Sequence, residues 1–328
     1  MKTAGDAGKK FAFEYLENHK NETIPVLLDE LLRPPTPPPP SPRKPSTPPP
    51  PSKPSTPPPV ETTNITLSFI TAEETKAEQY VQQGDIDLAL LTYRHIQPMT
   101  AHILNKMGEL SNLKKGDYDY ALQCHQQALE MQKESNEDVS GTLIYIGNAH
   151  RGRREYDIAL NYYTRALELR QKNPNINPTT IAFNLLSISK AHWARREYPE
   201  AISNAEQALA IQQSLVSSHE VNVGVTLALL GNFYRDAGDN IRALEFCTRA
   251  LDIFERTLSL YSSSTADVLY QIGKIQFSLG ALSDAHQSLQ RSSKMYRRLL
   301  PSGHPERVSV DKELRRVIQL LEQNQDGT

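Results

Sequence analysis

Short alanine-containing pairs recur along this chain at nearly constant intervals, and the interval constrains the fold more than any other feature. The small first residues of the clearest copies are 38, 42, 42 and 42 residues apart, at Ala121, Ala159, Ala201, Ala243 and Ala285, and a weaker copy begins at Ala89. Such a period is typical of helical repeat arrays, in which each unit buries its apolar face against its neighbours. An array of this kind has a long concave wall and no enclosed active site, so the sequence favours binding over catalysis.

Each repeat is predicted to be a pair of helices joined by a tight turn. In the clearest copy the first helix carries Leu230 and Gly231, a turn follows at 238–240, and the second helix carries Ala243 and Ala250. A small residue recurs on the first helix of four copies, at Gly147, Ser189, Gly231 and Gly273. We expect a small residue there because the first helix must pass close to the second at that point.

Motifs in three of the copies carry a family resemblance. The stretch Gly116-Asp-Tyr-x-x-Ala-Leu122, followed by Ala128-Leu129, resembles the tetratricopeptide repeat, as do the stretches 156–167 and 238–251. The spacing of 42 residues is similar to that of the lengthened repeats of kinesin light chains. The resemblance covers roughly residues 72–324 and implies an all-α, right-handed superhelical α-solenoid of helix–turn–helix repeats.

The turn between the two helices has a recognisable sequence in three copies. Gly116-Asp-Tyr118, Arg154-Glu-Tyr156 and Arg196-Glu-Tyr198 occupy equivalent places. We expect each tyrosine to pack over the small alanine three residues later. No ligand is predicted for these turns.

The chain divides into segments of different character. Residues 1–33 are predicted to be a short helical or partly ordered segment, 34–60 a proline-rich disordered linker and 61–71 a connector. About six helix pairs are expected over 72–303, and a capping helix over 304–324. One apolar stripe of that cap is predicted from Val308, Leu314, Val317, Ile318 and Leu321, and its water-facing side from Glu306, Lys312, Glu313 and Arg316.

Proline dominates the linker, because 16 of the 23 prolines lie between Pro34 and Pro59. A proline has no amide donor and a fixed φ, so such a stretch favours an extended polyproline II rod with no packed core. The linker contains a loose SH3- or WW-type ligand motif in two copies, made by Pro39, Pro42 and Lys44 and by Pro48, Pro51 and Lys53. A stiff spacer is the alternative interpretation of the same composition.

Composition excludes several classes of function. The net charge is −2, and no apolar run approaches the roughly 20 residues that span a bilayer, so neither nucleic acid nor a membrane is expected as a partner. Motifs for zinc, for nucleotide phosphates and for a nucleophile with its base are missing, so we expect no catalytic residue, metal or cofactor. No secretory signal is visible at the N-terminus, which favours a cytoplasmic protein. Cys124 and Cys247 are predicted to be buried, unpaired thiols.

The concave wall is the candidate site. In tetratricopeptide arrays the first helix of each pair lines the groove, and the resemblance carries this role to residues at equivalent offsets from the small position. The candidates are Asn148, Arg151, Lys190, Trp193, Asn232, Arg235, Tyr270, Lys274 and Phe277. Amides and cations alternating with aromatic rings suit an extended peptide that carries acidic groups. Trp193 suits packing between repeats equally well.

The predicted function is that of a non-enzymatic adaptor, which binds a peptide or helix in the concave groove while the proline-rich arm acts as a spacer or as an SH3/WW-type ligand. Two alternatives remain open. The chain is also compatible with the regulatory part of an enzyme whose catalytic domain is absent, and with a self-assembling structural scaffold subunit.

Overall fold

The computed structural model describes residues 72–114, 116–215 and 220–326, and helices are the regular secondary structure of these ranges. The all-α repeat fold predicted from the periodicity is confirmed. The segments expected at 1–33, 34–60 and 61–71 lie outside the described residues, as does the whole proline-rich ligand motif. None of the described helices combines the length and the apolar character that a bilayer span requires.

The chain forms two compact units, residues 1–128 and 129–328. In the first unit a helix over 72–82 precedes α3 (Ile86–His95) and α4 (Ala101–Leu113), and α5 (Tyr118–Glu134) runs from this unit into the second. Tyr93 and Ile103 are fully buried in the core of the first unit.

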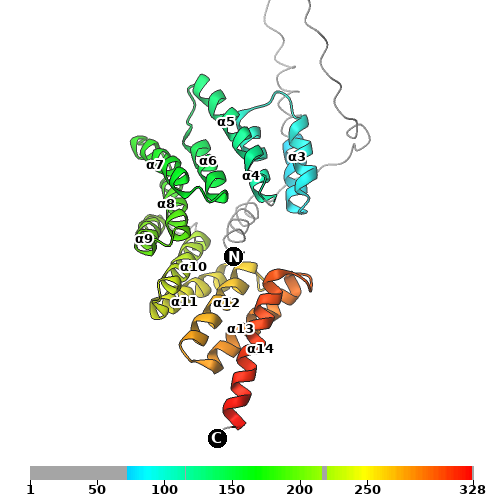
Figure 1. Ribbon diagram of the computed structural model, residues 1–328. Coiled ribbons are helices and arrows are strands. Elements are labelled where there is room, and N and C mark those ends of the chain that lie inside the picture. The colour runs from blue at the N-terminus through cyan, green and yellow to red at the C-terminus, as the bar shows by residue number, and fades with distance from the viewer. Residues whose placement is uncertain (1–71, 115, 216–219, 327–328) are drawn as a thin grey trace, which may run out of the picture. The chain divides into compact units, whose positions relative to one another are not determined.

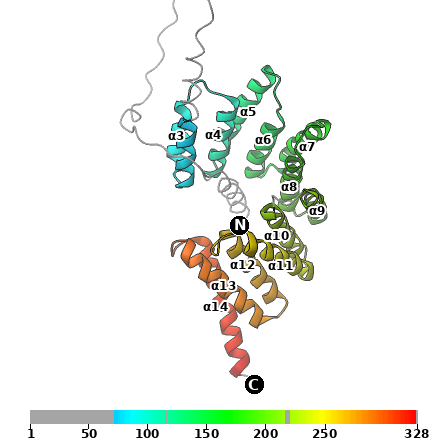
Figure 2. The ribbon, with the colours of Figure 1, turned by 180° about the vertical axis from the view of Figure 1, so that it is seen from behind.

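The second unit continues the succession of helices, coloured from green to red in Figure 1 and seen from behind in Figure 2. Each of its helices packs against the next one along the chain, and α6–α8, α10–α12 and α12–α14 are also in contact, so the first helices of successive pairs lie next to one another. The helices are α6 (Ser140–Gly152), α7 (Tyr156–Lys172), α8 (Pro178–Ala194), α9 (Tyr198–Ser214), α10 (Glu220–Asp236), α11 (Asn240–Thr257), α12 (Ser263–Ser278), α13 (Leu282–Leu299) and α14 (Pro305–Asp326).

The recurring small residue is the point of closest approach within each pair, as predicted. A Cβ atom added at Gly147 would overlap the ring of Tyr163, and one added at Gly231 would overlap Cys247 Sγ. The facing residue lies sixteen positions further along the chain in both cases. Gly273 faces Leu289 in the same way, and Gly108 faces His125 in the first unit.

Ser189 departs from the glycine rule, and its environment shows why the departure is tolerated. Its hydroxyl donates a 2.6 Å hydrogen bond to the Ala201 carbonyl oxygen, so the polar group that glycine lacks is satisfied within the helix pair. The residue sixteen positions on is Ala205, fully buried and the smallest of the residues at that position. The larger residue at the point of close approach on the first helix is therefore matched by a smaller residue on the second helix.

The terminal helix α14 packs its apolar side on the preceding pair. Val317 is fully buried, and Leu314 and Leu321 pack with it against Ala285 and Leu289. The predicted stripe is wrong at Val308, which is 49% exposed, while Val310 two residues later is buried. The packing stripe of α14 therefore begins at Val310, two residues after the position that the sequence pattern indicates.

Candidate functional site

The nine predicted wall residues are all half-buried, and they come from the first helices of four successive pairs. Two lie on each of α6, α8 and α10, and three lie on α12. Their contacts divide the set into two parts, one at α6 and a more extensive one that runs from α8 to α14.

Trp193 joins α8 to α10. Its indole Nε1 donates a 2.9 Å hydrogen bond to Asp236 Oδ2, and its ring lies 5.6 Å from the ring of Phe233. Trp193 therefore packs between repeats, one of the two roles that the sequence left open. Asp236 was not among the predicted residues, and it is the acceptor at the centre of the contacts that follow.

Arg235 is held in place by its neighbours. Its Nε and Nη2 donate to Asp236 Oδ1 over 2.9 and 2.7 Å, and its Nη1 donates to Asn232 Oδ1 over 3.1 Å and to Gln271 Oε1 on α12. Only 18% of this side chain is exposed. A guanidinium with this many partners is a fixed positive charge in the wall rather than a mobile one.

Lys274 is the least satisfied charge of the wall. Its ammonium lies 5.4 Å from the centroid of the Tyr270 ring, a cation–π contact within the same helix. Burial and, next, the positive charge of Arg235 lower the pKa of Lys274, while Asp236 and Glu313 act in the opposite direction. Among the described residues no carboxylate comes within ion-pair distance of this ammonium.

The terminal helix contributes to the same surface. The Arg316 guanidinium lies 4.8 Å from the centroid of the Phe277 ring, and Glu313 lies 3.9 Å from Arg316. Burial raises the pKa of Tyr270, and the charge of Glu313 raises it further. Arg316 is exposed, as predicted, although its guanidinium also lies over Phe277, whereas only 28% of the Glu313 side chain is exposed. The helix α14 packs beside α12 and extends the wall by one helix.

The α6 end of the wall has a different character. The Tyr163 hydroxyl donates a 2.8 Å hydrogen bond to Asn148 Oδ1, and Arg151 lies beside the same hydroxyl and lowers its pKa against the larger opposing effect of burial. Lys190 is half-buried on α8. Asn148 is thus engaged within its own helix pair.

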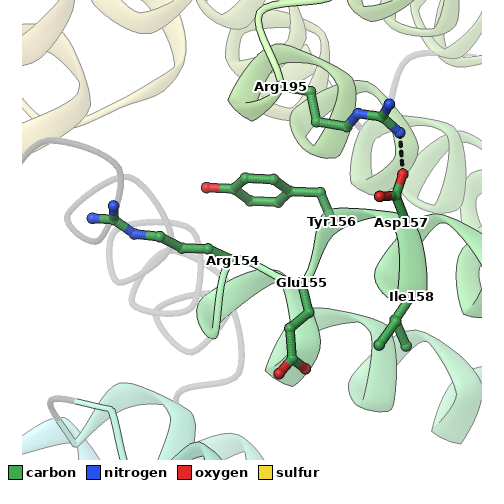
Figure 3. A pocket seen from close by; sticks show the side chains of 6 residues that line it. All are labelled: Arg154, Glu155, Tyr156, Asp157, Ile158 and Arg195. Carbon is green, nitrogen blue, oxygen red and sulfur yellow. Dashed lines mark hydrogen bonds and ion pairs between the residues drawn. The ribbon is translucent and has the colours of Figure 1, made fainter.

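A shallow pocket of about 270 Å³ lies away from the nine predicted residues (Figure 3). It is formed at the turn between α6 and α7, and Arg195 from the turn between α8 and α9 closes one side. Its lining residues are Arg154, Glu155, Tyr156, Asp157, Ile158 and Arg195. The sequence identified this stretch only as a turn.

The thiols and the metal-binding residue types offer no reactive centre in the described part of the chain. Cys124 and Cys247 are free and buried, as predicted, and burial raises the pKa of the Cys247 thiol to about 12. A thiol with so high a pKa is a poor nucleophile at neutral pH. Over the described residues, histidine, cysteine and carboxylate side chains nowhere gather in groups of three that could hold a metal ion.

Comparison with known proteins agrees with the fold. The sequence profile of the tetratricopeptide repeat family matches residues 138–214 and 222–298. A search of curated proteins finds no match.

Three solved structures illustrate the likeness. BtubC (BKLC) from P. vanneervenii superposes with a TM-score of 0.55 at 18% identity, over 73% of this chain and 94% of that one. A putative kinesin light chain of Podosopora anserina, with nearly identical TPR-like repeats, gives 0.51 at 14% identity over 63% and 100% of the two chains. NprR in complex with its cognate peptide NprX gives 0.53 at 16% identity over 80% and 78%. At these identities the likeness shows the fold alone.

Proposed function

We propose that this chain, which contains tetratricopeptide repeats over residues 138–214 and 222–298, is a non-enzymatic adaptor that binds an extended peptide with acidic groups. The binding surface is the wall formed by α8, α10, α12 and α14. The observation that carries the proposal is the half-buried Lys274 ammonium, which has no carboxylate partner among the described residues and lies next to the fixed charge of Arg235.

The charges of this surface support an anionic ligand. At the α10, α12 and α14 part of this surface, three cations, Arg235, Lys274 and Arg316, are set against two carboxylates, Asp236 and Glu313. Asp236 is already shared by Arg235 and Trp193, so a carboxylate from a ligand would neutralise the remaining charge. Charge-assisted bonds to a partly buried ammonium are stronger than bonds between neutral groups, because less water screens them.

The likeness to NprR supports a peptide as the ligand, since that protein was solved with its cognate peptide on a helical array of the same fold. Tetratricopeptide arrays typically serve as interaction modules, which agrees with an adaptor. The two buried, unpaired thiols support a reducing compartment, and we place the protein in the cytoplasm.

Affinity capture from cell extract tests the wall. The full-length chain is compared with Lys274→Glu and with Lys294→Glu, a matched charge reversal at an exposed residue of α13. We expect Lys274→Glu to lose specific partners that the wild type and Lys294→Glu retain. Equal capture by all three proteins would reject the wall as the binding surface. Circular dichroism establishes that both variants stay helical.

The proline-rich arm is proposed to act as a spacer or as an SH3/WW-type ligand, which gives the adaptor a second point of attachment. Joining two binding sites by a chain raises the effective concentration of the second partner without new contacts. An array of immobilised SH3 and WW domains, probed with the full-length chain and with Pro39→Ala/Pro42→Ala/Pro48→Ala/Pro51→Ala, tests the ligand role. Signals that survive in the variant would leave only the spacer role.

A further inference from the structure

In the part of the chain that the structure describes, six turns that join the two helices of a pair contain a residue with positive φ, and in two of them this residue is arginine. Glycine occupies the position in the other four turns, at Gly84, Gly116, Gly238 and Gly280. Arg154 and Arg196 adopt φ values of 66° and 67° at the equivalent place. A residue with a Cβ atom is strained in this region, whereas glycine is not. Two neighbouring repeats therefore keep an arginine where a glycine would be more stable.

The same two turns also lack a second stabilising feature. In three of the four glycine-containing turns the next residue is an aspartate that accepts from the following helix: Asp85 from Leu88 N and Asp239 from Arg242 N, both over 3.0 Å, and Asp117 from Tyr120 N over 3.4 Å. The Gly280 turn has Ala281 at this place and no such bond. Glu155 and Glu197 stand at the cap position of α7 and α9 and make no such bond. A missing cap lowers the stability of the helix that it would begin.

The two glutamate side chains instead contact residues that precede them in the chain. Glu155 Oε2 lies 2.6 Å from His150 Nδ1 and its other oxygen lies 3.1 Å from Arg153 Nη2. In the next repeat Glu197 makes the equivalent contacts, 2.7 Å to His192 Nδ1 and 2.8 Å to Arg195 Nη2. These contacts hold each turn in its shape and occupy the carboxylates.

Arg154 and Arg196 take no part in these contacts. Both side chains are exposed, and among the described residues neither forms an ion pair or a side-chain hydrogen bond. Backbone hydrogen bonds hold each turn, since Arg154 N donates to Arg151 O over 3.0 Å and Arg196 N to Trp193 O over 2.9 Å. Within the described part of the chain, no contact of the two arginine side chains offsets the strain. Local rules that are broken together, without a compensating side-chain contact, are typical of functional surfaces.

The shallow pocket lies at the first of these turns. Arg195 of the next repeat donates a hydrogen bond to Asp157, and this contact closes one side of the pocket. Arg154 and Tyr156 extend from the turn on the other side of the pocket (Figure 3). Ile158 adds an exposed apolar surface at the rim. Arg154 and the ring of Tyr156 extend to the same side of the turn (Figure 3), an arrangement that suits an acidic side chain with an apolar neighbour.

We propose that the turns 153–157 and 195–199 form a second docking surface, for an acidic segment of a partner protein, in which Arg154 and Arg196 each bind a carboxylate. Four carboxylates lie in or next to these turns, Glu155, Asp157, Glu197 and Glu200. They repel the continuous phosphate backbone of a nucleic acid, while a peptide can place single carboxylates between them. This surface is independent of the wall that contains Lys274.

Fluorescence anisotropy with a labelled octaglutamate peptide and the full-length chain tests the surface, at about 50 mM salt so that screening stays weak. Arg154→Gln/Arg196→Gln is compared with Arg165→Gln/Lys172→Gln, which removes two charges from exposed positions of α7. We expect the first variant to bind at least about tenfold more weakly than wild type and the control to stay within about twofold. Arg154→Gly/Arg196→Gly should lose binding equally while its melting temperature stays the same or rises, because glycine relieves the strain.

Each other outcome overturns the proposal. Wild type that fails to bind the peptide at about 1 mM, or equal losses in both glutamine variants, shows that these arginines form no specific site. Binding of oligo(dT) or of vesicles rich in phosphatidylserine with the same dependence on Arg154 and Arg196, and at least as tightly as the peptide, assigns the surface to a different partner class. Binding lost in Lys274→Glu but kept in Arg154→Gln/Arg196→Gln assigns the acidic peptide to the wall alone, which supports the proposed function and rejects this one.

Discussion

The hydroxyl of Thr226 donates a 2.7 Å hydrogen bond to Gln212 Oε1 in the buried seam between α9 and α10. The threonine is fully buried and the glutamine is 3% exposed. Thr142 and Gln132 make the equivalent bond over 2.6 Å. Each pair joins the second helix of one repeat to the first helix of the next, so a polar contact specifies how two repeats stack.

Removing one partner of this bond should cost more than removing both. We expect Thr226→Val to lower the free energy of unfolding by about 1–3 kcal/mol, because Gln212 Oε1 is left without this donor in a dry seam. Thr226→Val/Gln212→Leu should recover part of the loss, since no buried acceptor then remains. Urea denaturation measures both variants, and a double variant no more stable than Thr226→Val would contradict this account.

Gly231→Ala should destabilise the protein although alanine is the better helix former. The new methyl group would overlap Cys247 Sγ, and overpacking of a core costs about 1–3 kcal/mol. Adding Cys247→Ala should restore much of the loss. Gly141→Ala, on the open side of α6, is the control and should be neutral or stabilising. A Gly231→Ala protein as stable as the wild type would show that the two helices do not approach closely at Gly231.

Trp193→Phe separates the polar contact of Trp193 from its packing. The phenylalanine ring keeps contact with Phe233 but loses the bond to the Asp236 carboxylate, and we expect a loss of about 1.5 kcal/mol. The change also removes the only tryptophan of the chain, so thermal unfolding is followed by circular dichroism. Full stability in the variant would mean that the bond to Asp236 contributes nothing.

The pH dependence of stability should show the effect of the buried carboxyl group of Asp267. Burial, and next the charge of Glu306, raise the pKa of this carboxyl well above its ordinary value. A raised folded-state pKa means that the charged form is penalised in the folded protein, so stability falls as pH rises from the ordinary value through the folded-state pKa. Asp267→Asn should therefore be more stable than wild type at neutral pH, and the difference should shrink in acid.

Urea midpoints at several pH values check this prediction, with exposed Asp284→Asn as the control. The asparagine oxygen can still accept from the Tyr296 hydroxyl, the bond that Asp267 receives in the wild type. A gap between Asp267→Asn and wild type that does not depend on pH would show that ionisation is not its cause.

The sequence predicted the repeat fold well because its signal is geometric. Gly147, Gly231 and Gly273 recur at fixed intervals, since every helix pair needs one close approach, and this requirement holds whatever the ligand is. Periodicity could likewise identify which residues occupy equivalent places on the first helices of successive pairs. It could not predict that Arg235 would be held by Asp236 and Gln271, because those contacts depend on side-chain directions across neighbouring repeats.

The arginine turns escaped prediction for a different reason. A left-handed turn is recognised in sequence by glycine, and Arg154 and Arg196 carry no such signal. Their equivalence to Gly238 emerges only after the repeats are aligned and the backbone angles are compared. The role of Arg316 was hidden for a similar reason, because the stacking of α14 beside α12 brings its side chain over Phe277.

The small residue at the point of close approach on each first helix is matched in size to the residue that it faces on the second helix. This matching limits how such an array can change in length. If recombination joined the first helix of one pair to the second helix of the next, Gly147 would face Ala205 across an empty space, and the complementary product would force Ser189 against the larger Tyr163. Whole helix pairs can be duplicated or lost without this penalty, because each carries both halves of its own match. The volume pairing therefore makes the helix pair the unit by which the gene can lengthen or shorten without harming the protein.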